Sequence, residues 1–366
     1  MPLEVKAVLD RQVPAYLAGE VVKITVFLRN VHLSGAKSVS ECVAWGSVQL
    51  GCERTGGGRI RDEKRRPTTS IAKSNTCVYS SCPTILFCDI KLAANEHKTF
   101  TSQIELPLYG LPPSFRGNLI RYYNRITIAV QHFNSPIKML HIPIHVIPAV
   151  GIESKQPAAS NPFLFETTSR PTMSEIVTAT VDQITAPRKE YIYQMTNSSG
   201  KVGSLTLYKK AYKLGEDIIG KLSFQDAEVC CFQWSVHLET IENIEDDEKT
   251  ETQDKKSSTV SWAMQHNVSA DFVENTFRLP IPLHAPPTFN TNSVRLKWRL
   301  RFEFVTCKEL QSTPSINAAG FRVWSAPDNV PIETLSWHVD LFVLACSPYN
   351  VALTDSNLTG SAILVI

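Results

Sequence analysis

The sequence lacks an excess of charge of one sign, a long apolar run and a recognisable catalytic motif. Its 366 residues carry 37 basic and 35 acidic side chains, so bulk electrostatics give no reason to expect a nucleic-acid-binding protein. The longest apolar candidate near the C-terminus, 339–346, falls well short of the roughly 18 residues that a membrane-spanning helix requires. The first residues enter an alternating pattern at once, so no signal peptide is expected.

Cysteine occurs nine times, an odd number, in a chain without an evident secretory signal. We therefore expect free thiols rather than disulfides. Cys77, Cys82 and Cys88 are close together in the sequence, but their spacing fits no zinc-binding motif and no histidine pair completes it. The sequence predicts no metal and no other cofactor.

Other sequence matches to chemical motifs are weak. Gly215–Lys221 has the spacing of a phosphate-binding loop, but Leu222 follows where that loop needs Ser or Thr, and the alternation over 218–224 predicts a strand. His141 and His145 are four residues apart on a predicted strand, which would separate them by about 13 Å, too far to share a metal. The sequence therefore predicts a binding protein and not an enzyme.

A two-residue hydrophobic period dominates the chain. In 294–306, the clearest case, six apolar side chains alternate with charged ones, which predicts a strand with one buried and one solvated face. Short segments of this kind, separated by Gly, Pro and Asn turns, predict an all-β fold of antiparallel β-sandwiches. Pro143 places one of these strands at a sheet edge. The other predicted strands include 4–10, 21–29, 100–106, 119–130, 138–146 and 218–224.

An internal repeat divides the chain into two copies. Tyr16–Glu20 and Tyr212–Glu216 share the pattern Tyr-x-x-Gly-Glu, and each precedes a predicted strand. Leu106–Phe115 and Leu279–Phe289 both run from Leu-Pro to Pro-Pro-x-Phe. Two copies of one sandwich are the simplest explanation, because order is kept while loop lengths drift.

The two copies are separated by a segment rich in Pro, Ser and Thr, which predicts a linker. It contains one candidate helix, 174–185, that Ser174 could cap. We therefore expect residues 1–148 to form an N-terminal sandwich, 149–187 a linker and 188–366 a C-terminal sandwich.

A basic stripe is the candidate binding surface. Arg295, Lys297, Arg299 and Arg301 share one face of the 294–306 strand over about 20 Å. Like charges in a row repel one another unless acids or a partner lie opposite them. The stripe is either a solvated sheet face with acidic cross-strand neighbours or a docking surface for an acidic partner or anionic lipid head groups.

Three further segments are open to two interpretations each. The mostly basic loop 53–73 and the mostly acidic loop 239–256 are either solvated insertions or opposed docking patches. Asn161-Pro162-Phe163 is either a turn that fits endocytic adaptor pockets or, as we prefer, an anchor in which Phe163 and Phe165 pin the linker onto a domain.

Several segments resemble known families. The Tyr-x-x-Gly-Glu pattern of each half, and Leu111–Gly117 leading into Arg121–Tyr123, resemble the arrestin superfamily. Tyr212–Asp217 and Ser293–Thr306 are similar to the Rgp family of retrograde Golgi transport proteins. The same resemblance takes in Pro83–Asp89, Asn134–Ile137, Tyr191–Tyr193, Gly200–Val202 and Ser336-Trp337.

This resemblance implies two tandem arrestin-like sandwiches and a role as the smaller subunit of a heterodimeric guanine-nucleotide exchange factor complex. The larger, propeller-bearing Ric subunit would be its partner. The complex would activate a Golgi Rab GTPase of the Rab-six type in retrograde endosome-to-Golgi and intra-Golgi transport. The chain would be cytosolic and peripheral on the Golgi membrane, and it would bind neither nucleic acid nor a small-molecule substrate.

Two other functions compete with this expectation. An arrestin-like or retromer-like cargo adaptor would use the same fold to bind sorting signals at a sheet edge or in the crevice between domains. A hydrolase on a sandwich scaffold would need paired carboxylates at neighbouring strand ends and usually a secretion signal, and no such signal is expected in this sequence.

Overall fold

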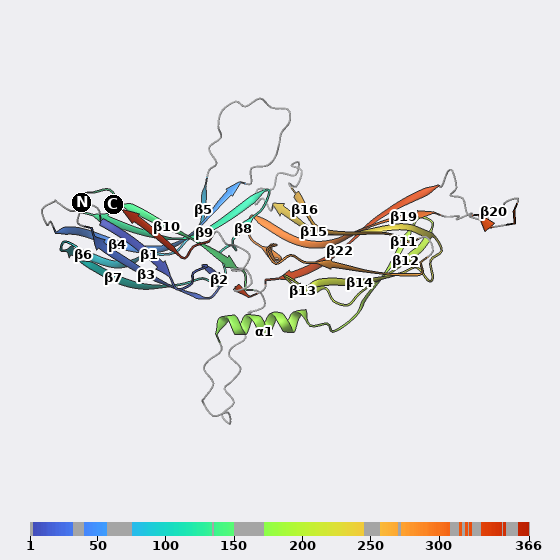
Figure 1. Cartoon of the computed structure of the whole chain (residues 1–366), viewed down its shortest axis with the longest axis horizontal. Helices are drawn as coiled ribbons and strands as arrows, with labels where there is room; N and C mark the ends of the chain where they lie inside the picture. Colours follow the sequence, from blue (N-terminus) through green and yellow to red (C-terminus); the bar gives the residue numbers. More distant parts are fainter. Residues whose placement is uncertain are drawn as a thin grey trace, which may run out of the picture.

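Two β-rich bodies lie along the long axis of the molecule (Figure 1). They are built from strands β1 to β23 and one helix, α1. The computed structural model describes residues 3–31, 40–56, 75–133, 135–149, 172–244, 257–269, 272–307, 315–316, 319–320, 322–323, 331–345, 347–348 and 358–365. Asn161-Pro162-Phe163 and most of the two charged loops, 57–73 and 245–256, lie outside the described residues.

The first body contains a four-stranded and a seven-stranded sheet, which we call the first sandwich. The four-stranded sheet has the order β23-β1-β3-β7, and the larger sheet has the path β2-β10-β9-β4-β5, with β6 on β4 and β8 on β9. The four-stranded sheet contains β1 (Leu3–Leu9), β3 (Val21–Asn30), β7 (His97–Glu105) and β23 (Ser361–Val365). The larger sheet contains β2 (Ala15–Leu17), β4 (Glu41–Gly56), β5 (Thr76–Ser80), β6 (Thr84–Leu92), β8 (Phe115–Arg116), β9 (Ile120–His132) and β10 (Lys138–Ile147).

The second body, which we call the second sandwich, repeats this plan. Its sheets have the orders β11-β12-β14-β17 and β13-β22-β19-β15-β16, with β18 on β19. The smaller sheet contains β11 (Tyr191–Asn197), β12 (Gly200–Leu207), β14 (Asp217–Ser223) and β17 (Glu274–Pro280). The larger sheet contains β13 (Ala211–Lys213), β15 (Cys230–Ile244), β16 (Ser257–Val268), β18 (Phe289–Asn290), β19 (Val294–Cys307) and β22 (Ile332–Leu344); β20 (Ser315–Ile316) and β21 (Arg322–Val323) form a separate pair.

Each sandwich has its own hydrophobic core, filled by the inward residues of its alternating strands. In the first core, Val5 of β1 packs in one cluster with Ile126 of β9 and Ile142 of β10. In the second, Trp234 of β15, Phe277 of β17 and Phe302 of β19 are fully buried or nearly so. Because a strand turns alternate side chains to opposite faces, the sequence period accounts for both cores. A mostly β chain consistent with two β-sandwiches confirms the predicted fold class at this level.

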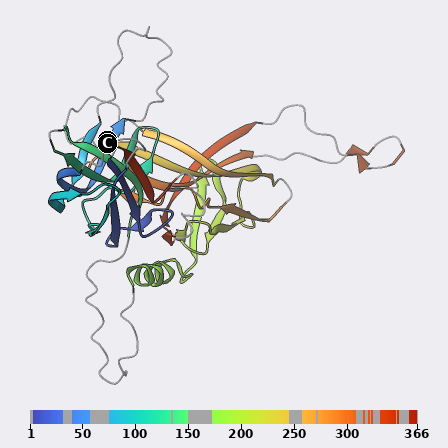
Figure 2. The same cartoon turned by 60° about the vertical axis from the view of Figure 1, so that its left-hand side comes forward.

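The strand order shows where the two copies differ. In the second sandwich β11 is the edge strand beside β12, whereas in the first sandwich the corresponding edge beside β1 is taken by β23. β23 pairs antiparallel with β1, from Glu4 opposite Val365 to Val8 opposite Ser361. Figures 1 and 2 show β23, in dark red, within the blue and cyan body. β23 therefore falls within the predicted C-terminal range 188–366 in the sequence but hydrogen-bonds to a strand of the first sandwich; the domain bounds themselves stay a prediction.

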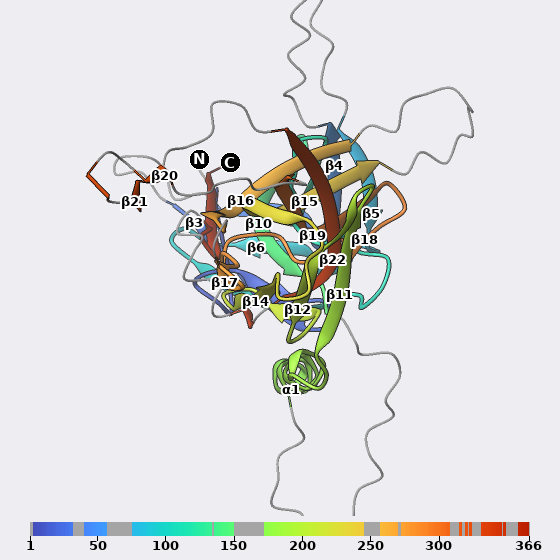
Figure 3. The same ribbon diagram turned by 90° about the vertical axis from the view of Figure 1, so that its right-hand side faces the viewer.

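The segment expected to be a linker contains α1 (Met173–Thr185). Thr172, rather than the expected Ser174, caps it: Thr172 Oγ1 accepts from Glu175 N, and the Glu175 side chain accepts from Thr172 N. This capping box fixes the helix start. Val177 and Val181 join the second core, and the helix lies outside the sheets along one side of the molecule (Figure 3). α1 is therefore packed onto the second sandwich.

Two short strand pairs depart from the antiparallel prediction. β2 pairs parallel with β10, and β13 pairs parallel with β22. Both follow from the repeat, since β2 and β13 contain the tyrosines of the two Tyr-x-x-Gly-Glu segments. β2 covers only the last residues of β10, so the stretch around Pro143 faces a sheet edge, as predicted.

Candidate functional site

The basic stripe lies on the outer face of β19, the central strand of its sheet. Burial alternates along β19, so that Leu296, Trp298 and Leu300 enter the core. This confirms the predicted strand and its two faces. The four stripe residues Arg295, Lys297, Arg299 and Arg301 are partly exposed between the buried positions.

Glu239 of β15 lies between the last two arginines of the stripe. Its carboxylate accepts hydrogen bonds from Arg299 Nε at 3.0 Å and Arg301 Nε at 2.9 Å, and only 5% of its side chain is exposed. Arg301 also pairs with Glu303. Burial alone would lower the pKa of Arg301, but its hydrogen bonds and the two carboxylate charges outweigh burial, so the pKa lies above its ordinary value.

The first half of the stripe is contacted differently. Arg295 Nε donates to Asn290 Oδ1 at 3.4 Å. Lys297 lies opposite Ile241 of β15, and within the described residues no acidic side chain pairs with it. Among the described residues, Lys297 is therefore the stripe cation without an acidic neighbour. A role of the stripe in partner binding stays a prediction.

The two sandwiches meet at a buried carboxylate. Glu242 is on the inward face of β15, and its side chain accepts hydrogen bonds from three successive backbone N–H groups of the loop before β9: Asn118 at 2.8 Å, Leu119 at 3.1 Å and Ile120 at 2.7 Å. Successive N–H groups that converge in this way form an anion-binding nest. Gly117 has no side chain at the approach, where a Cβ would lie 2.5 Å from Glu242 Oε1.

The Pro-Pro-x-Phe segments of the two copies also meet at this contact. Phe115 and Phe289 lie edge to face, with ring centroids 4.9 Å apart. Their neighbours add two hydrogen bonds: Tyr122 Oη with Thr291 Oγ1 at 3.0 Å, and Arg54 Nη1 to Ser293 Oγ at 2.8 Å. The repeated motif therefore places matching aromatic residues on the two sides of one contact.

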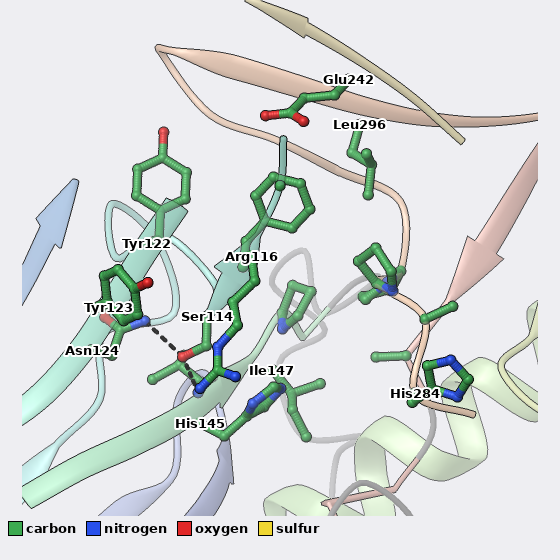
Figure 4. A pocket seen from close by; sticks show the side chains of 18 of the residues that line it. Ser114, Arg116, Tyr122, Tyr123, Asn124, His145, Ile147, Glu242, His284 and Leu296 are labelled. Carbon is green, nitrogen blue, oxygen red and sulfur yellow. Dashed lines mark hydrogen bonds between the residues drawn. The ribbon is translucent and has the colours of Figure 1, made fainter. Parts of the chain in front are cut away.

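A cavity of about 740 Å³ opens beside this contact (Figure 4). Ser114, Arg116, Tyr122, Asn124 and His145 line it from the first sandwich, and Glu242, Trp262, His284, Pro286 and Leu296 from the second. Ser114 Oγ accepts from Asn124 Nδ2 at 3.1 Å, and Asn124 Oδ1 is buried without a hydrogen-bond partner in the described structure. The cavity is a candidate binding site, because concave sites with a few convergent polar groups commonly hold ligands.

The two Tyr-x-x-Gly-Glu segments form the same turn. The glycine has a positive φ in both copies, +87° for Gly19 and +85° for Gly215. Residues other than glycine rarely adopt this conformation. The glutamate carboxylate accepts from a backbone N–H three residues earlier, at 2.8 Å for Glu20 and 2.9 Å for Glu216. This turn is a structural element of the fold, and its duplication supports the repeat.

The remaining chemical candidates lie apart from one another. Gly220 is inside β14 and packs against Phe277, so the segment is the predicted strand rather than a phosphate-binding loop. His141 bonds to Thr127 at 3.1 Å. Cys77, Cys82 and Cys88 are exposed and free. Across the described ranges, no group of three His, Cys, Asp or Glu side chains is placed to hold a metal ion.

Sequence reasoning missed Glu239, Glu242 and Asn124. Both glutamates fall in a segment that reads as a charged loop, although β15 continues to Ile244. Their position within a long alternating strand was a usable signal. No sequence signal could have identified Asn124, because the residues around it come from three separate segments of the chain. Among the described helices, none is long and apolar enough to cross a membrane.

Comparison with known proteins agrees with the sequence resemblance. The chain is 33% identical to the human (Homo sapiens) protein named RAB6A-GEF complex partner protein 2, over 94% of this chain and 95% of that protein. It is 32% identical to the protein of the same name from cattle (Bos taurus), over 93% of each. The Rgp1 family pattern matches residues 15–160 and 160–307. The chain therefore belongs to the Rgp1 family.

Proposed function

We propose that this chain is the non-catalytic partner subunit of a heterodimeric guanine-nucleotide exchange factor complex that acts on a Golgi Rab GTPase of the Rab-six type. The observation that carries the proposal is similarity over almost the whole length of both chains to RAB6A-GEF complex partner protein 2. Its larger partner would be the propeller-bearing Ric subunit. The site of action would be the cytosolic surface of the Golgi, in retrograde transport.

The described surface is suited to binding. Exchange breaks no covalent bond: a factor that binds the nucleotide-free GTPase more tightly than the loaded form weakens nucleotide binding by the same factor. A thousandfold faster release requires a barrier lower by about 4 kcal/mol, which interface contacts can supply. The inter-sandwich cavity and the outer face of β19 are the two surfaces that we assign to such contacts.

Nucleotide release tests the proposal. The purified Rab GTPase, loaded with a fluorescent guanine nucleotide, is mixed with the large subunit alone or with the pair. We expect the pair to release nucleotide at least tenfold faster. Equal rates, together with no stable association of this chain with the large subunit, would refute the proposal.

Charge reversal tests the contribution of the stripe. Lys297→Glu is the suitable variant, because Lys297 has no acidic partner in the described part of the chain, whereas Arg299 and Arg301 hold Glu239. We expect weaker association with the large subunit or the GTPase at low salt. Unchanged association would leave the stripe a solvated sheet face.

A further inference from the structure

β16 is the last strand of its sheet and has an open edge. Among the described strands, its one ladder partner is β15. Near the C-terminal end of β16, the side chain of Gln265 accepts a hydrogen bond from Arg278 N of β17 at 3.0 Å. β17 therefore covers this part of the β16 edge. Over 257–264 no other described strand pairs with it, so one row of backbone N–H and C=O groups is left for an added strand.

The composition of β16 does not protect this edge. Proteins usually guard an exposed edge with charged side chains, proline or short length, but β16 has twelve residues and contains no Lys, Arg, Asp, Glu or Pro. The other terminal strands are shorter: β7 has nine residues with Lys98 and Glu105, and β17 has seven residues with Glu274, Arg278 and Pro280. Val260 and Met264 add exposed apolar side chains to the open edge.

The open edge runs along the inter-sandwich cavity. Ser258, Val260 and Trp262 of β16 line the cavity, and Ser258 Oγ accepts from Asn118 Nδ2 of the first sandwich at 3.0 Å. Trp262 stacks on Trp298, with centroids 5.8 Å apart, and meets His284 edge to face. A strand added to β16 would therefore place side chains at the mouth of the cavity.

The cavity's polar groups indicate what those side chains would be. Arg116 is exposed and lines the cavity with His145 and His284 (Figure 4), and nowhere in the described chain does an acidic side chain pair with it. Glu242 is already held by three backbone donors. Asn124 Oδ1 is an unused acceptor in a residue that is 2% exposed. An acidic residue complements Arg116 and the two histidines, whereas Asn124 Oδ1 suits a donor such as a backbone N–H of the added segment.

We propose that an extended, acidic segment of the large subunit adds to the open edge of β16 and reaches into the inter-sandwich cavity. Backbone hydrogen bonds would supply the docking and the cavity the selectivity, as in other strand-addition complexes. This inference rests on the proposed function, because it assigns the segment to the larger partner.

Hydrogen exchange of the purified pair tests the inference directly. The full chain alone and the full chain bound to the large subunit are compared by mass spectrometry. We expect at least tenfold slower exchange of the β16 amides at 257–264 in the pair. If the pair forms and these amides exchange as in the free chain, the inference is overturned and the proposed function stands; if no pair forms, both fail.

Matched variants give a second readout. Met264→Lys places a charge on β16 that should oppose the addition of another strand. Ile192→Lys is the control, because it places the same charge on β11, another terminal strand of the same sandwich, at a position of similar exposure (63% against 61% for Met264). We expect Met264→Lys and Arg116→Glu each to weaken affinity for the large subunit tenfold or more, and Ile192→Lys to change it less than twofold. Equal effects of the two lysines would contradict the proposal. Should a variant fail to fold by circular dichroism, the exchange data on the unaltered chain decide.

Discussion

The carboxylate of Glu242 accepts a hydrogen bond from the backbone N–H of Ile120 at 2.7 Å, joining β15 of the second sandwich to the start of β9 in the first. The N–H groups of Asn118 and Leu119 bind the same side chain. A single glutamate thus satisfies three backbone donors across the contact, of which Ile120 N–H is buried. Its position affects both the stability of the chain and the shape of the cavity beside it.

Replacing this glutamate should weaken the contact between the sandwiches. Glu242→Ala removes the acceptor of three backbone N–H groups, of which that of Ile120 is buried, and an unsatisfied buried group costs about 1–3 kcal/mol. We expect a loss of about 3 kcal/mol in the free energy of unfolding, measured by urea denaturation. Glu274→Ala is the control, because among the described residues its half-exposed side chain forms an ion pair with Lys221, and the loss of a surface pair of this kind should cost less than about 1 kcal/mol. If the two variants lost the same free energy of unfolding, the hydrogen bonds to Glu242 would add no stability beyond that of a surface ion pair.

Removing the charge of Glu239 should destabilise the second sandwich. Glu239→Gln leaves Arg299 and Arg301 without their shared counter-charge, and breaking such a buried pair costs about 3 kcal/mol. Thermal unfolding measures the loss. Asp226→Asn is the control. Asp226 forms a surface ion pair with Lys201, so this variant should change the free energy of unfolding by less than about 0.5 kcal/mol. If Glu239→Gln left the melting temperature unchanged, the ion pairs of Glu239 with Arg299 and Arg301 would not stabilise the fold.

His237 should make stability depend on pH. Burial, and then the charge of Arg301, lower the pKa of His237 below its ordinary value of 6.5. The unfolded chain therefore binds this proton more readily, so stability is complete above pH 6.5 and falls as the pH drops below it. The pKa of His141 is lowered in the same direction, by burial first and then by Arg125.

Unfolding midpoints between pH 7.5 and 5 check this prediction. We expect His237→Gln to reduce the slope below pH 6.5, and the double variant with His141→Gln to reduce it further. His97→Gln, on an exposed position of β7, should keep the full slope. A slope that survives in the double variant would assign the dependence to other groups.

The cysteines should divide by burial in their reactivity. Burial raises the pKa of the Cys52 thiol to about 12 and of the Cys231 thiol to about 11, so at pH 8 only about one Cys52 in ten thousand is a thiolate. With a thiol reagent and peptide mass spectrometry, we expect Cys42, Cys77, Cys82 and Cys88 to react in the native chain. Cys52 and Cys231 should react at measurable rates only in denaturant. Rapid native labelling of Cys52 would contradict its place in the core.

The sequence by itself determined the strands that have a clear alternation, because a two-residue period indicates which side chains are buried and which face the solvent. The stretch 294–306 and the two Tyr-x-x-Gly-Glu turns were predictable for this reason, and the turns require glycine at a positive φ. The family was also recognisable from segments spread over both halves of the chain, and the Rgp1 family pattern matches residues 15–160 and 160–307.

Only the tertiary structure decided which distant segments meet. It pairs Ser361–Val365 with β1, which lies more than 350 residues earlier in the sequence. It also places the Glu239 carboxylate between two arginines and the Glu242 carboxylate against three backbone N–H groups. Local periodicity carries no information on these contacts, because strand pairing and docking between sandwiches depend on complementary surfaces that exist only after each sandwich has folded.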